Sequence, residues 1–120
     1  MLKRHPELRL VGEAADGLAA VQEASKLKPD LILMSTGLPN LHGIEAAKRI
    51  RRAVPSTKIL FLTENSDAGV VRAALGTGAN GYVLKADAAS ELWPAIKAVV
   101  QGRKYVSSGV EGGSIQAAVS

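Results

Sequence analysis

The stretch LILMSTGLPN, residues Leu31–Asn40, decides how this chain folds. Its first four residues, Leu31–Met34, form a continuous apolar run, which is typical of a strand covered on both faces in a parallel sheet. The run ends abruptly at Ser35 and Thr36, so we expect the strand to lead into a polar loop there. Open α/β sheets bind ligands at the carboxyl ends of their strands. The stretch therefore predicts a strand-end site that offers hydroxyl groups but no carboxylate, imidazole or thiol.

Strand and helix patterns alternate along the rest of the chain, because short apolar runs are separated by segments with apolar residues at helical spacing. The expected strands are Leu8–Val11, Leu31–Met34, Lys58–Thr63 and Gly81–Leu84. The expected helices run from the turn at 15–17 to Leu27, from Gly43 to a stop at Pro55, over Asp67–Thr77, and over about Ala89–Gln101 with Pro94 in the first turn. By the right-handed crossover rule this order predicts a doubly wound α/β domain with a parallel sheet between helices.

The composition is that of one ordinary domain, with 120 residues, 47% hydrophobic and 22% charged. We expect a domain over residues 1–106 and a flexible tail or remnant linker over 107–120, which is rich in Ser, Gly and Ala. No apolar run approaches the roughly 18 residues of a membrane span, so we expect no membrane association and a cytoplasmic protein. The chain has no cysteine, which excludes disulfides, thiolate chemistry and cysteine metal sites. Its two histidines are isolated in sequence, so they cannot form a histidine cluster.

A net charge of +4 raises the question of nucleic-acid binding. The dense basic cluster, Lys48, Arg49, Arg51 and Arg52, lies on an expected helix whose other face is apolar, and the chain has only one Trp, two Tyr and one Phe to stack on bases. We therefore favour a solvated helix face and consider direct nucleic-acid binding unlikely. A functional anion or nucleic-acid patch is the alternative.

Polar residues follow three of the expected strands: Ser35 and Thr36, then Thr63 and Glu64, then Lys85. The carboxyl ends of parallel strands share one edge of the sheet, so two hydroxyl groups and an ammonium group should converge there. Such a set suits an oxyanion, because lysine can hold a phosphate or carboxylate as a point charge. The alternative is that these hydroxyl groups only cap the helices that follow.

The stretches GEAADGLAAV, PDLILMSTGLPNLHGIEAAKRIR, KILFLT, GANGYVLKADAASEL and GRKYVSSGV resemble the receiver domain of bacterial two-component response regulators. The resemblance is closest to the NarL/FixJ type, which precedes a LuxR-type DNA-binding domain, and it covers about Leu2 to Val110. It implies a flavodoxin-like fold. It also implies that Thr63 is the switch hydroxyl, Tyr82 the switch aromatic, and Lys85 the lysine that pairs with the phosphoryl group.

The chain departs from the receiver pattern in two places. Ser35 stands where the family has its phospho-accepting Asp. The family's first strand, with its acidic magnesium ligands, and most of its first helix are absent, so we expect the magnesium site to be lost and no cofactor to bind. In the strand order 2-1-3-4-5 the absent strand is central. Its loss would leave unpaired edges at Leu8–Val11 and Leu31–Met34, which favours strand rearrangement or self-association.

The leading interpretation is a degenerate receiver, or pseudo-receiver: a non-enzymatic, phosphorylation-independent signalling or protein-interaction module. We expect it to bind a protein partner and to form a homodimer through an apolar stripe on the last helix that is partly uncovered, Leu92, Ile96, Val99 and Val100. One alternative is a truncated fragment of a NarL/FixJ-type response regulator in phosphorelay signal transduction. A receiver that still catalyses its own phosphorylation would need an acceptor that we do not find, and a nucleic-acid-binding basic module is less favoured.

Overall fold

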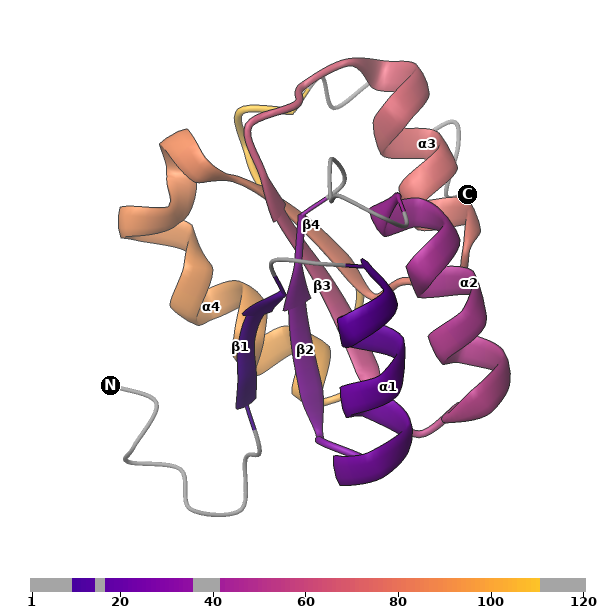
Figure 1. The fold of residues 1–120 in the computed structure, drawn as a ribbon. Helices are drawn as coiled ribbons and strands as arrows, with labels where there is room; N and C mark the ends of the chain where they lie inside the picture. Colours follow the sequence, from indigo (N-terminus) through magenta and orange to yellow (C-terminus); the bar gives the residue numbers. More distant parts are fainter. Residues whose placement is uncertain (1–9, 15–16, 36–41, 111–120) are drawn as a thin grey trace.

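The computed structural model describes residues 10–14, 17–35 and 42–110, and within these it describes side chains from residue 17 onward. Strands and helices alternate along this part of the chain (Figure 1). The strands are β1 (Leu10–Ala14), β2 (Leu31–Met34), β3 (Lys58–Thr63), β4 (Gly81–Leu84) and β5 (Tyr105–Val106). The helices are α1 (Gly17–Leu27), α2 (Gly43–Ala53), α3 (Ala68–Gly76) and α4 (Ala88–Val100), and a 3-10 turn, Lys85–Asp87, precedes α4.

The sheet has five strands in the order β1-β2-β3-β4-β5, and every neighbouring pair is parallel. The predicted doubly wound α/β architecture is therefore confirmed, and β2, β3 and β4 have the predicted bounds. β5 was not predicted, because a strand of two residues is too short to show an alternating pattern.

The first strand differs from its prediction in both extent and neighbours. It was expected at Leu8–Val11 but is observed at Leu10–Ala14, while residues 8 and 9 lie outside the described residues. β1 pairs directly with β2, with Leu10 opposite Leu31 and Ala14 opposite Met34, and the register shifts between Leu10 and Glu13. The gap that a missing central strand would leave is closed, which is one of the outcomes that the sequence left open. Closing it satisfies backbone N–H and C=O groups that would otherwise lack partners.

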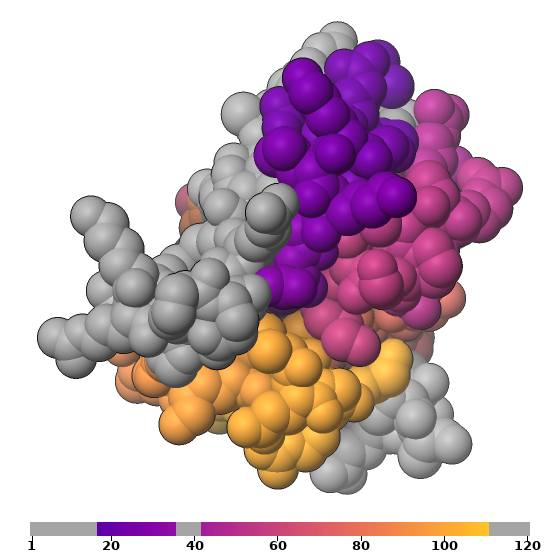
Figure 2. All heavy atoms as spheres, turned by 90° about the horizontal axis from the view of Figure 1, so that it is seen from below, coloured from indigo at the N-terminus to yellow at the C-terminus, as the bar shows by residue number. Residues whose placement is uncertain are grey.

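Helices α1, α2 and α3 cover one face of the sheet and α4 covers the other (Figure 1). Seen from below, the indigo α1 and the orange-to-yellow α4 lie on opposite sides of the molecule (Figure 2). Alternate residues of each strand point to the two layers. Ile32, Met34, Phe61 and Tyr82 belong to the larger apolar cluster, whereas Leu31, Leu33, Leu60 and Val83 pack with α4 in the smaller one.

The last helix buries most of the stripe that we expected to be partly uncovered. Ile96 and Val99 are 2% and 0% exposed because they face the sheet, and Leu92 is partly buried against the same cluster. Val100 is 41% exposed, so part of the stripe is uncovered, as expected, while these two residues are buried. Pro94 lies inside α4, beyond the first turn where we expected it. Pro94 has no backbone N–H, so the carbonyl four residues earlier lacks its helical donor. Because Pro94 is exposed, this carbonyl lies on the outer side of the helix.

Local contacts set the helix ends. The Asp67 carboxylate accepts the Val70 N–H at 3.1 Å and caps α3, and Gly102 follows α4 with a φ of +86° that favours glycine.

None of the helices in the described part of the chain is long and apolar enough to cross a membrane.

Candidate functional site

The polar residues predicted at the strand ends are brought to one edge of the sheet. Ser35 directly follows β2, Thr63 is the last residue of β3, and Lys85 directly follows β4. Thr63 lies opposite Leu84, so Lys85 is one residue beyond the partner of Thr63. Ser35 is partly exposed, Thr63 is 4% exposed and Lys85 is exposed. We call Ser35, Thr63, Tyr82 and Lys85 the switch corner.

The Thr63 hydroxyl lies in the turn that leads into α3. Its oxygen accepts the Asn65 N–H at 3.4 Å, and the Asn65 side-chain oxygen accepts the Asp67 N–H at 2.9 Å. Asp67 in turn caps α3. The hydroxyl therefore supports the local turn, as the capping alternative anticipated, while lying at the predicted edge.

Tyr82 is fully buried on β4 and points inward beneath the loop between β3 and α3. Its hydroxyl group donates a hydrogen bond of 2.6 Å to the Asn65 backbone oxygen, and its ring centroid lies 6.0 Å from that of Phe61. Asn65 thus binds both Thr63 and Tyr82 through its backbone. The sequence analysis missed Asn65. Its place in a short polar loop directly after a buried strand was the available signal.

Two acidic residues lie near the switch corner. Glu64 follows Thr63 and is exposed. Glu13 is opposite Leu33 in the pairing of β1 with β2, two residues before Ser35 in that register, and it was not predicted because the expected strand ended at Val11. Among the residues that the structure describes, no three histidine, aspartate or glutamate side chains come together as metal ligands. The loss of the magnesium site stays a prediction.

A second polar cluster joins the start of α4 to the chain that leaves β5. Asp87 accepts the Ser107 hydroxyl and the Gly109 N–H, both at 2.9 Å, while the Ser107 oxygen accepts the Leu84 N–H at 3.1 Å. Glu91 accepts the Tyr105 hydroxyl at 2.8 Å and both the N–H and the hydroxyl of Ser108. We call these contacts of Asp87 and Glu91 the C-terminal latch.

The latch shifts two ionisation equilibria. Hydrogen bonds from Ser108, and then from Tyr105, lower the pKa of Glu91 below its ordinary value. Burial, followed by the hydrogen bond to Glu91, raises the pKa of Tyr105. Ser107 and Val110, which we expected in the tail, are 1% and 4% exposed. The division of the chain at residue 106 stays a prediction, and the described residues after it are held against α4 and the core.

Comparison with known proteins places this architecture in a family. The profile described as the response regulator receiver domain matches residues 1–97. The chain is 38% identical over 106 residues to the transcriptional regulatory protein DegU of Brevibacillus brevis, covering 88% of this chain and 45% of that protein. It is 38% identical over 111 residues to the transcriptional regulatory protein LiaR of Bacillus subtilis, covering 92% and 53%. The chain thus spans about half the length of these curated relatives.

Solved structures agree with the sequence relatives. A LuxR-family two-component response regulator from Aurantimonas sp. SI85-9A1 superposes with a TM-score of 0.81 at 33% identity, covering 92% of this chain and 79% of that one. The Salmonella typhimurium response regulator RcsB gives a TM-score of 0.76 at 29% identity, covering 91% and 55%. The chain therefore belongs to the receiver domain family of two-component response regulators, and its relatives are of the NarL/LuxR type.

Proposed function

We propose that this chain is a degenerate receiver, a non-enzymatic signalling or protein-interaction module that works without phosphorylation at its strand-end site. The proposal rests on Ser35, which directly follows β2 and which, by the resemblance, takes the position of the family's acceptor Asp. A serine hydroxyl is a weak nucleophile unless an adjacent base activates it. It also cannot form the acyl phosphate that a carboxylate forms.

The remaining members of the switch corner are proposed to keep their family positions without their trigger. Thr63 stands for the switch hydroxyl, Tyr82 for the switch aromatic and Lys85 for the phosphate-pairing lysine. The hydrogen bonds of Asn65 with Thr63 and Tyr82 need no phosphoryl group, and they support a single inward state of Tyr82. A ligand moves a two-state equilibrium only if it binds one state better, and here no such ligand acts.

Magnesium is proposed to play no part. Phosphoryl transfer depends on positioning and on neutralising charge. In the family, magnesium is held by the acceptor Asp together with an acidic pair, and the side chain at position 35 supplies only a hydroxyl. The chain is therefore proposed to have neither a metal cofactor nor catalytic activity.

The proposed setting is the cytoplasm, with a homodimer and a signalling protein as partners. A solved structure of RcsB is described as two dimers bound to two parallel DNAs, which supports dimer formation in this family. Of the predicted stripe on α4, the exposed Val100 and the partly buried Leu92 remain for such a contact. Direct nucleic-acid binding by this chain is less favoured. We also propose the division into a receiver-like domain, 1–106, and a tail, 107–120.

A second candidate function is that of a portion of a NarL/FixJ-type response regulator in phosphorelay signal transduction. The observation that favours it is the chain's coverage of 45% and 53% of DegU and LiaR. In that case the chain would act within a longer protein that carries an output domain.

The experiment that tests the proposed function is NMR with beryllofluoride, a phosphoryl mimic that receivers bind at their acceptor carboxylate. We expect the Thr63 amide and Tyr82 ring signals to stay unchanged on adding beryllofluoride and Mg²⁺, with one set of Tyr82 ring signals throughout. Saturable shifts at both residues, or two interconverting Tyr82 states, would contradict the proposal.

A further inference from the structure

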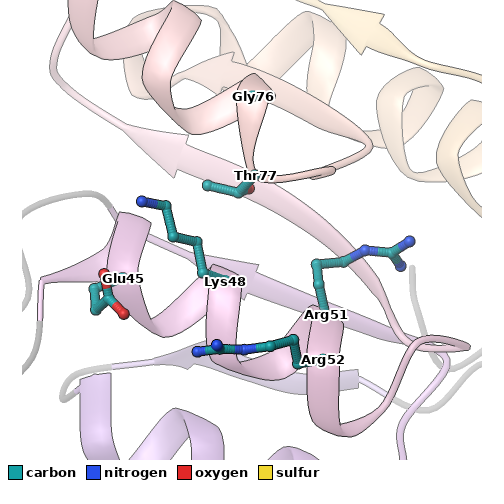
Figure 3. A pocket seen from close by; sticks show the side chains of 6 residues that line it. All are labelled: Glu45, Lys48, Arg51, Arg52, Gly76 and Thr77. Atoms are coloured by element: carbon teal, nitrogen blue, oxygen red, sulfur yellow. The ribbon is translucent and has the colours of Figure 1, made fainter.

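An open hollow of about 520 Å³ lies between α2 and the end of α3, away from the switch corner. Its lining residues are Glu45, Lys48, Arg51 and Arg52 on α2 and Gly76 and Thr77 at the end of α3 (Figure 3). The volume falls within the range of small-molecule sites, about 300 to 1,000 Å³. Three of the six lining side chains are cations and one is a carboxylate, so the hollow carries an excess of positive charge.

Two i,i+4 pairs of charged residues on α2 differ in how their charges are matched. Glu45 and Arg49 form an i,i+4 ion pair at 3.8 Å, in the order that stabilises a helix. Lys48 and Arg52 have the same i,i+4 spacing with like charges, an arrangement that costs a helix about 0.2 to 0.5 kcal/mol. In Figure 3 the Lys48 side chain extends from α2 toward Thr77, and the Arg52 side chain runs along α2 below it. An anion held between them would remove this repulsion.

Helix electrostatics explains only part of the basic cluster. Arg51 and Arg52 lie in the last turn of α2, where cations are favourable against the helix dipole. Lys48 lies in the middle of the helix, so this explanation does not apply to it. Lys48 lines the hollow although the helix dipole does not account for its charge, which supports a binding role for this side chain.

Parts of the hollow are already fixed in place. Arg51 donates a hydrogen bond from Nη1 to the Pro55 oxygen at 2.8 Å, and its Nε passes 3.1 Å from where a Cβ on Gly78 would lie. Gly78 has a φ of +94°, which glycine adopts freely. The Thr77 hydroxyl group donates a hydrogen bond of 2.7 Å to the Ala74 backbone oxygen, so this side chain is fixed as part of the wall of the hollow. Lys48 and Arg52 are exposed and free to approach a ligand's charge.

We propose that this hollow binds a compact diphosphate anion, clamped between the Lys48 ammonium and the Arg52 guanidinium with Arg51 as the fixed wall. Guanidinium groups match phosphate oxygens in pairs, and the ammonium adds a point charge. Among the described residues, none that lines the hollow is aromatic, so the proposed recognition rests on the charge of the phosphates and not on base stacking. The anion is either inorganic pyrophosphate or the diphosphate group of a nucleotide.

The test is isothermal titration calorimetry of the intact chain with inorganic pyrophosphate at low salt. We expect pyrophosphate to bind at least tenfold more tightly than orthophosphate. We expect Lys48→Gln and Arg52→Gln each to weaken it about tenfold or more, as the loss of one charge-assisted hydrogen bond predicts. Arg72→Gln is the matched control, because it removes one exposed cation from α3 outside the hollow and should change the affinity less than twofold.

Equal losses of pyrophosphate affinity in Arg72→Gln and Lys48→Gln would show that the anion is held by the overall charge of the protein, and would overturn the proposal. Pyrophosphate binding no tighter than orthophosphate binding would also overturn it. Adenosine diphosphate separates the two sources of the anion: affinity equal to or above that of pyrophosphate supports a nucleotide, and weaker affinity supports the free anion. A DNA duplex that displaces pyrophosphate at a lower concentration than adenosine diphosphate would make the hollow part of a nucleic-acid surface and overturn the proposal.

Discussion

The switch corner and the C-terminal latch lie at opposite sides of β4 and use polar residues in different ways. At the switch corner, β2 leads into Ser35, and the hydrogen bonds of Thr63 and Tyr82 meet at the Asn65 backbone. At the latch, the carboxylates of Asp87 and Glu91 accept hydrogen bonds from the chain that follows β5. In both regions the polar side chains hold backbone segments in place, but only the latch does so through carboxylates.

The largest effect is expected from breaking the latch with Asp87→Ala. The change leaves the buried Ser107 hydroxyl without its acceptor and removes the partner of the Gly109 N–H. We expect the free energy of unfolding to fall by about 1 to 3 kcal/mol, the usual cost of leaving a buried polar group unsatisfied. Urea denaturation followed by circular dichroism measures it.

The control for that prediction is Glu23→Ala, which removes one exposed carboxylate from α1. It should change stability by less than about 0.5 kcal/mol. Equal stability of Asp87→Ala and the control would show that the latch does not hold the end of the domain.

A smaller effect is expected from Tyr82→Phe at the switch corner. The change removes the 2.6 Å hydrogen bond to the Asn65 oxygen but keeps the buried ring. Asn65 is exposed, so water can take the lost place, and we expect a loss of about 0.5 to 1.5 kcal/mol in the same assay. A loss larger than that of Asp87→Ala would reverse the ranking of the two regions.

A still smaller effect on the free energy of unfolding is expected when the pH is lowered. Hydrogen bonds from Ser108 and Tyr105 lower the folded-state pKa of Glu91 below its ordinary value of 4.5. Its contribution to stability is therefore fully present above about pH 4.5 and is lost as the pH falls through the lower folded value. The stability difference between the wild type and Glu91→Gln, measured from pH 7 downward, should narrow in acid. A difference that widens below pH 4.5 would contradict the assigned contacts.

The sequence was sufficient to predict the parallel α/β architecture because its main strands can be recognised from local residue patterns. The apolar runs of β2, β3 and β4 are bounded by turn residues, and their observed bounds match the prediction. Caps account for the small differences at α3, where the predicted ends Asp67 and Thr77 are the capping residues. Local residue patterns thus determine most of this fold.

Contacts between distant residues could not be read from the sequence. The pairing of β1 with β2 depends on which strand edge is available, and the burial of Ile96 and Val99 depends on how α4 turns toward the sheet. The candidate site shows the same limit. Ser35, Thr63, Tyr82 and Lys85 were predicted from the chain, whereas the contacts through Asn65 and the latch appear only when segments 14 to 22 residues apart in sequence meet.

The central claim is that the end of β2 cannot accept a phosphoryl group, and intact-protein mass spectrometry after incubation with acetyl phosphate and Mg²⁺ tests it most directly. We predict an unchanged mass for the wild type, because a serine hydroxyl without an adjacent base is a weak nucleophile and cannot form the acyl phosphate that a carboxylate forms. A stoichiometric gain of one phosphoryl group by the wild type that Ser35→Ala abolishes would contradict the account.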